Sequence, residues 1–155
     1  MYILMLITMV AAKPVELPKS TKDIARIETH LKRHLAHDSV PASQLAPVIY
    51  RLARKYNVSQ SLIVRVIITE SRGRAGAYNL KSRDCGIAQI NDRTAGLYGR
   101  KLETICNPGN WRQNLELGVK ILSSTTRPCS YNVGPRYHKK LTQCLNYERK
   151  LASVK

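Results

Sequence analysis

The 155-residue chain is long enough for one folded domain, since a domain of that size buries roughly 70% of the surface that its unfolded chain exposes. Apolar residues make up 43% of it and charged residues 23%, which excludes a long disordered chain. The net charge of +16 predicts attraction to polyanions. However, there is no basic zipper helix, no zinc-finger spacing and no aromatic platform among the lysines, so we expect no nucleic-acid partner.

The N-terminus carries an apolar run over residues 3–12, which is too short to span a bilayer as a helix. It ends in small residues, with Val10 and Ala12 at the spacing of a signal-peptidase site. No Lys or Arg precedes the run, so a short uncleaved anchor is the alternative. We expect residues 1–12 to be a signal peptide or short anchor and the protein to be exported, to the periplasm, the cell envelope or the exterior, a virion included. After cleavage we expect no stable membrane insertion.

The N-terminal half predicts three helices. Residues 13–42 form an N-terminal extension. It contains one amphipathic helix over residues 20–37, which Pro41 terminates. A second helix over 43–56 opens the main domain (43–155) and closes at Asn57. A third runs from a Ser59 cap to about residue 71 and is apolar nearly all round, which predicts burial.

The second half is less regular. Residues 72–86 have a loop composition, and any short strands are expected there. Asn107-Pro108-Gly109 opens another helix in which Trp111 lies on the core face, and two short helices fit between residues 128 and 154. The fold class expected is mainly α, a helical bundle around a substrate cleft with at most a small β region.

Four cysteines lie in the second half of the chain. Their even number in an exported protein predicts two disulfides among three possible connectivities. We expect neighbours in sequence to pair, Cys85 with Cys106 and Cys129 with Cys144; four reduced buried thiols are the alternative. No pair has the spacing of a structural zinc site.

Glu70 differs from the other acidic residues, most of which lie among lysines and arginines. It follows Ile63, Val66 and Ile67 at spacings that place its carboxyl on an apolar helix face. Burial there disfavours the ionised form and raises the pKa of the carboxyl, as a general acid working near neutral pH requires. Glu70 is therefore the candidate catalytic acid.

A series of motifs accompanies Glu70. Glu70-Ser71 is followed by Gly86-Ile87-Ala88-Gln89-Ile90-Asn91, then by Ser130-Tyr131-Asn132-Val133-Gly134, and finally by Tyr147. This order and spacing, over about residues 45–150, resembles the lytic transglycosylases of the lysozyme superfamily. Ile87-Ala88 departs from the Leu-Met of that family, and the small Ala88 predicts a wider cleft floor.

The resemblance implies a role for each matching residue. Glu70 is the sole catalytic acid and base, and no metal or organic cofactor is needed. The substrate is the peptidoglycan glycan strand, cleaved at the β-1,4 bond between N-acetylmuramic acid and N-acetylglucosamine with a 1,6-anhydro product. The substrate-binding residues implied are Ser71, Gly86, Gln89, Asn91, Tyr131, Asn132 and Tyr147.

Three alternatives stay open. The segment Ser82–Asn91 is also similar to animal-type lysozymes, in which an Asp before the Gly is a second catalytic carboxylate, so Asp84 could make the enzyme a hydrolytic muramidase. A non-catalytic, basic cell-wall-binding or assembly factor is the second alternative. Besides the glycan strands, a component of a secretion apparatus or of a phage is a further partner that the sequence leaves open. His30, His34 and His37 could together bind a metal, but a solvated basic face fits their surroundings better.

Overall fold

The computed structural model describes residues 19–125 and 141–154. Its first helix, α1 (Lys19–Lys32), ends earlier than predicted, and the expected continuation to residue 37 is wrong. The reason is tertiary: the backbone N–H of Ala36 donates to the carbonyl of Arg72, and that of Val40 donates to the carbonyl of Gly73. These bonds to the end of the α3 region replace the ones that another helical turn would have made.

Helices α2 (Ala42–Tyr56) and α3 (Gln60–Glu70) confirm the two predicted segments. Asn57 closes α2 in the left-handed conformation at φ 52°, which Asn tolerates better than most residues. Ser59 stands at the N-cap of α3, but its side chain does not cap the helix. Its hydroxyl instead shares a hydrogen bond of 2.8 Å with that of Ser61.

The region 72–86 contains a small β element, in the place where the sequence left room for short strands. Strands β1 (Tyr78–Asn79) and β2 (Asp84–Cys85) pair antiparallel, with Tyr78 opposite Cys85 and Asn79 opposite Asp84. Two short helices follow that the sequence analysis did not predict, α4 (Asp92–Leu97) and α5 (Leu102–Cys106). A disulfide between Cys85 and Cys106 ties the hairpin to α5, which confirms this pairing.

The predicted helix after Asn107 begins as a 3-10 turn, η1 (Pro108–Asn110), and continues as α6 (Trp111–Ser123). Trp111 is buried, so its assignment to the core is confirmed. The last helix is α8 (Leu141–Ser153). Two helices were expected between residues 128 and 154, and the part of that region before α8 lies outside the described residues. The same holds for Tyr131 and Asn132 and for the predicted pairing of Cys129 with Cys144.

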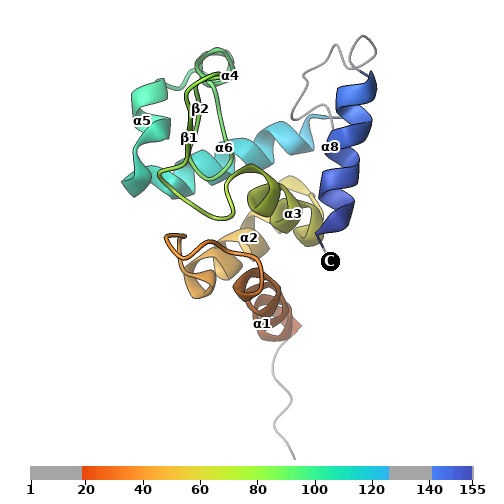
Figure 1. Ribbon diagram of the computed structural model, residues 1–155. Helices are drawn as coiled ribbons and strands as arrows, with labels where there is room; N and C mark the ends of the chain where they lie inside the picture. The colour runs from red at the N-terminus through yellow and green to blue at the C-terminus, as the bar shows by residue number, and fades with distance from the viewer. Residues whose placement is uncertain (1–18, 126–140, 155) are drawn as a thin grey trace, which may run out of the picture.

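Helix α3 lies at the centre of the molecule, where it contacts α1, α2 and α8 (Figure 1). The hairpin, α4 and α5 lie on one side of it and α8 on the other, with α6 running between them. The core beneath includes fully buried side chains from α2, α3 and α6, among them Leu45, Ile49, Ile63, Ile67 and Leu115. The mainly helical fold class with a small β region is therefore confirmed. None of the helices in the described ranges has the length and apolar character needed to cross a membrane.

Candidate active site

Glu70 is the last residue of α3, and its carboxyl meets the side chain of Tyr147 from α8. The Tyr147 hydroxyl donates a hydrogen bond of 2.7 Å to Oε1 of Glu70. Tyr147 is itself buried in a small cluster with Val66, Leu122 and Leu151. Packing of the phenol ring therefore fixes the position of its hydroxyl, and the hydroxyl in turn orients the carboxyl.

The electrostatic setting of Glu70 favours its protonated form. Burial, the largest influence, raises the pKa of the Glu70 carboxyl above its ordinary value. The hydrogen bond from Tyr147 lowers that pKa, the negative charge of Asp84 raises it, and the positive charge of Lys150 lowers it. The net direction is upward, as the sequence predicted for a group that donates a proton near neutral pH.

Asp84 lies in β2 and is half-buried. Its Oδ2 accepts a hydrogen bond of 2.5 Å from the hydroxyl of Ser82. Its charge is felt at Glu70, so the two carboxyl groups belong to one electrostatic site. The candidate second carboxylate thus comes from the hairpin, whereas Tyr147 comes from α8.

Ser71 follows Glu70 and links two backbone segments beside it. Its side chain is 2% exposed, and its hydroxyl donates to the carbonyl of Ile87 at 2.8 Å. The same oxygen accepts from the backbone N–H of Gly73 at 3.0 Å. The hydroxyl thus joins the end of α3 to the loop that follows β2, and these backbone partners account for its donor and one acceptor position.

The motif residues after β2 also bond to the backbone. Gln89 adopts φ 49°, and its side-chain amide donates to the carbonyls of Gly86 at 2.9 Å and Ala77 at 3.2 Å. Asn91 caps α4, since its Oδ1 accepts from the backbone N–H of Thr94 at 2.9 Å. In the described structure, Gln89 and Asn91 shape the loop beside Glu70 through these bonds.

Asn114, which is 0% exposed, also belongs to the site and was not predicted from the sequence. Its Nδ2 donates to the carbonyls of Cys85 and Ile105 at 3.0 and 3.2 Å, and its Oδ1 accepts from the N–H of Ala88 at 2.8 Å. The signal was a lone Asn on the apolar face of α6, because a buried amide in such a place requires partners. Gly86 has φ 75° and packs so closely on this amide that a Cβ there would lie 2.3 Å from Nδ2.

The three histidines do not share one helical face. The rings of His30 and His34 lie 5.1 Å apart, but α1 ends before His37, so the spacing that suggested three ligands does not apply. Within the described ranges, no three or more His, Cys, Asp or Glu side chains are grouped so that they could hold a metal ion.

Comparison with known proteins identifies the family. The model of the transglycosylase SLT domain matches residues 47–144, which is more than half of the chain. This range includes Glu70, Asp84 and the loop after β2, whereas α1 precedes it and Tyr147 follows it. No curated protein and no solved structure is significantly similar to the chain. The chain belongs to the transglycosylase SLT domain family, whose substrate is peptidoglycan.

Proposed function

We propose that this protein is a lytic transglycosylase that cleaves the β-1,4 bond between N-acetylmuramic acid and N-acetylglucosamine and leaves a 1,6-anhydro end. The observation that carries the proposal is the buried Glu70 carboxyl held by the Tyr147 hydroxyl at 2.7 Å. A carboxyl that keeps its proton near neutral pH can donate it to a leaving oxygen.

The proposed reaction has two steps at one carboxyl. Protonated Glu70 gives its proton to the glycosidic oxygen while the bond from that oxygen to C1 of the muramic acid breaks. The substrate's acetamido oxygen supports the positive charge at C1, a substrate-assisted variant of glycosidase chemistry. The Glu70 carboxylate then removes a proton from the C6 hydroxyl, whose oxygen bonds to C1. The carboxyl is regenerated and no water is consumed.

The surroundings of Glu70 support both steps. Burial favours the protonated carboxyl that begins the reaction, and the Tyr147 hydroxyl and the Lys150 charge stabilise the carboxylate that follows. The raised pKa is the balance of these effects, which suits a group that must both donate and accept one proton. Ser71 and Gln89 support the site by holding the backbone beside Glu70, and Tyr131 and Asn132 are proposed to face the sugar.

Replacing Glu70 tests the proposal. E70Q keeps the shape of the side chain and removes its proton chemistry, so lysis of purified peptidoglycan should fall by about 10²-fold or more. Turbidity loss of a wall suspension measures the rate. The matched control is E103Q, which changes an exposed Glu in the first turn of α5 and should leave lysis unchanged. Equal lysis by E70Q and wild type would refute the catalytic role.

A hydrolytic muramidase is the second candidate, and the observation that favours it is the charge of Asp84 acting on Glu70. In that reaction Asp84 would stabilise the oxocarbenium ion or attack C1, and water would complete the cleavage. For the proposed transglycosylase, D84N should retain lysis to within about tenfold and shift its pH dependence, because only an electrostatic influence on Glu70 is lost. A loss comparable to that of E70Q would instead support the muramidase.

We also propose that the protein acts outside the cytoplasm, where peptidoglycan lies, after cleavage of residues 1–12. A role beside a secretion apparatus or in a phage fits the same activity. A non-catalytic wall-binding factor would be supported if both the wild type and E70Q bound peptidoglycan without lysing it.

A further inference from the structure

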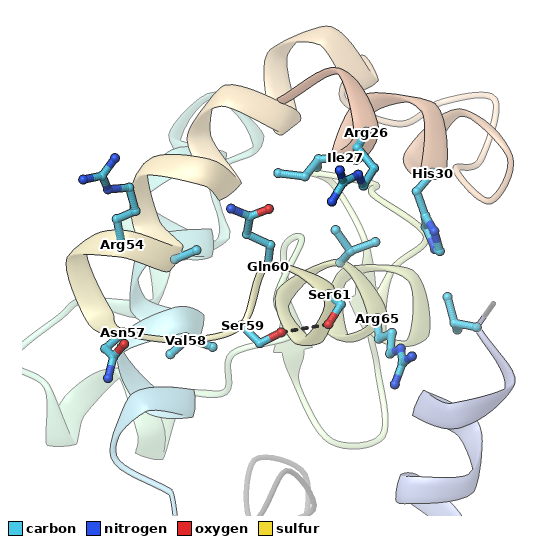
Figure 2. Close-up of a pocket in the computed structure, with 13 residues that line it drawn as sticks. Arg26, Ile27, His30, Arg54, Asn57, Val58, Ser59, Gln60, Ser61 and Arg65 are labelled. Carbon is cyan, nitrogen blue, oxygen red and sulfur yellow. Dashed lines mark hydrogen bonds between the residues drawn. The ribbon is translucent and has the colours of Figure 1, made fainter. Parts of the chain in front are cut away.

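A pocket lies apart from Glu70, where α1 and the end of α2 meet the beginning of α3 (Figure 2). Its volume is about 700 Å³, within the range of about 300–1,000 Å³ typical of ligand sites. Neither Glu70, Asp84 nor Tyr147 lines it. Since α1 precedes the matched range 47–144, the pocket joins the family domain to an element outside the match.

The pocket is basic. Arg26 from α1, Arg54 from α2 and Arg65 from α3 line it, and no Asp or Glu among the described residues does. The Arg26 side chain is 82% exposed, and its ion pair with Asp23 is long at 3.9 Å, so solvent screens it strongly. Neither Arg54 nor Arg65 forms an ion pair with a described carboxylate, although the Arg54 guanidinium donates to the Tyr50 hydroxyl at 3.0 Å. The three guanidinium groups therefore favour an anionic ligand.

The backbone adds to this preference. Ser59, Gln60 and Ser61 line the pocket, and they form the N-terminus of α3. The first N–H groups of a helix have no partner within it and carry a partial positive charge. Here the Ser59 hydroxyl does not cap them, and no acidic residue lies in the first turn. A carboxylate in the pocket would find both donors and a favourable field.

One ring nitrogen of His30 has no partner among the described residues. Its Nε2 is buried and makes no hydrogen bond with any described residue. Buried polar side-chain atoms rarely lack a partner in folded proteins. His30 also lines the pocket, but its Nε2 has almost no accessible surface and does not face the open space, so this atom does not carry the argument for a ligand.

The pocket surface is also partly apolar, so a ligand that fits it needs an apolar group besides its negative charge. Aliphatic side chains from α1, α2, α3, the α2–α3 turn and the C-terminus form this part: Ile27, Ala53, Val58, Val64 and Val154. A phosphate polymer could neutralise the arginines but has no group to cover such a surface. An acidic polypeptide that carries an aliphatic side chain matches both features.

We propose that this pocket binds an acidic segment of a partner protein. Its carboxylates would pair with Arg26 and Arg54 and reach the N-terminus of α3, and a leucine-sized side chain would cover the apolar part. The site is independent of wall cleavage, since none of its residues belongs to the Glu70 site.

The test uses the full chain and a panel of short synthetic peptides in which Asp or Glu alternates with Leu. Two matched panels replace either the acidic residues by their amides or Leu by Ser, and inorganic polyphosphate is the phosphate probe. Binding is measured by NMR amide shifts at physiological ionic strength, which suppresses non-specific attraction to the basic surface. We expect the acidic and apolar peptides to bind about tenfold tighter than both matched panels and to shift the amides of Ser59–Ser61.

Two double variants make the result specific to the pocket. R26E/R54E should weaken peptide binding by about tenfold or more, whereas R51E/R112E reverses two exposed arginines elsewhere and should retain it. Both should lyse walls equally well, so failure here is distinguishable from failure of the Glu70 proposal. The inference is overturned if no peptide binds or if both double variants lose binding equally. It is also overturned if polyphosphate, and none of the peptides, shifts the amides of Ser59–Ser61.

Discussion

The protonation of Glu70 rests on a small number of side chains that act in opposite directions. Burial and the charge of Asp84 raise the pKa of its carboxyl, whereas Tyr147 and Lys150 lower it. Since proton donation requires the protonated form, activity should fall as the pH rises through this raised pKa. The alkaline limb of the pH profile thus reports on the neighbours of Glu70.

Tyr147 gives the clearest residue-scale prediction. In Y147F the donated hydrogen bond is lost, so the pKa of Glu70 rises further and the alkaline limb of the kcat/KM profile moves to higher pH. The carboxyl also loses its orientation, which should lower the maximal rate by up to about 10²-fold. The control is Y98F, whose hydroxyl pairs with Ser124 on the surface and should move neither quantity. An alkaline limb that stays in place or moves to lower pH would contradict the assigned contact.

At the scale of elements, the hairpin, α5 and α6 meet through Asn114. This one amide bonds to backbone groups of the β2 region and of α5, and the Cys85–Cys106 disulfide closes the same junction. The loop that carries Gln89 is therefore fixed from beneath by α6. Because Asp84 precedes this junction directly, we expect the position of its carboxylate to depend on the junction.

Gly86 is the point at which this junction is most sensitive. In G86A the new Cβ would lie 2.3 Å from Nδ2 and 2.5 Å from Cγ of Asn114, at a φ of 75° that L residues rarely adopt. We expect a loss of about 2–4 kcal/mol in the free energy of unfolding, measured by urea denaturation. G96A is the control, since nothing lies within 4 Å of its Cβ and α4 tolerates Ala. Equal stability of G86A and G96A would show that the Asn114 junction is loosely packed.

Apolar periodicity was sufficient to predict α2 and α6, because their buried faces repeat over several turns, and a nearly continuous apolar run predicted α3. Periodicity failed at the end of α1, which was predicted to continue to residue 37. There the backbone N–H groups of the following residues donate to the carbonyls of Arg72 and Gly73 instead. Periodicity also missed α4 and α5, since six and five residues hold too few turns to show a period.

For the site, the sequence identified Glu70 from its apolar face, and the motifs added Tyr147, which lies 77 positions away. The bonds of Ser71, Gln89 and Asn91 to nearby backbone groups could not be predicted, because a motif names residues without showing which partners they have. Asn114 was recognisable in principle from its apolar neighbours, but its three partners come from segments that only the fold brings together.

At the scale of the whole molecule, the net charge of +16 favours contact with an anionic substrate. A strongly basic protein is concentrated at an anionic cell wall by long-range attraction, whatever its catalytic residues. Helix α1 lies outside the matched range and contributes Arg26 and His30 to the pocket between α1, α2 and α3. The molecule thus combines a family domain that acts on peptidoglycan with a basic surface for which we propose a separate partner.

The most direct test of the central claim is the mass of the products released from purified peptidoglycan. A transglycosylase adds no water at C1, so the muropeptides should carry 1,6-anhydro ends and be lighter by one water molecule than the hydrolysis products. E103Q should give the same anhydro products as the wild type, and E70Q should give almost none. Muropeptides with reducing ends and no anhydro form would contradict the account and assign the reaction to hydrolysis.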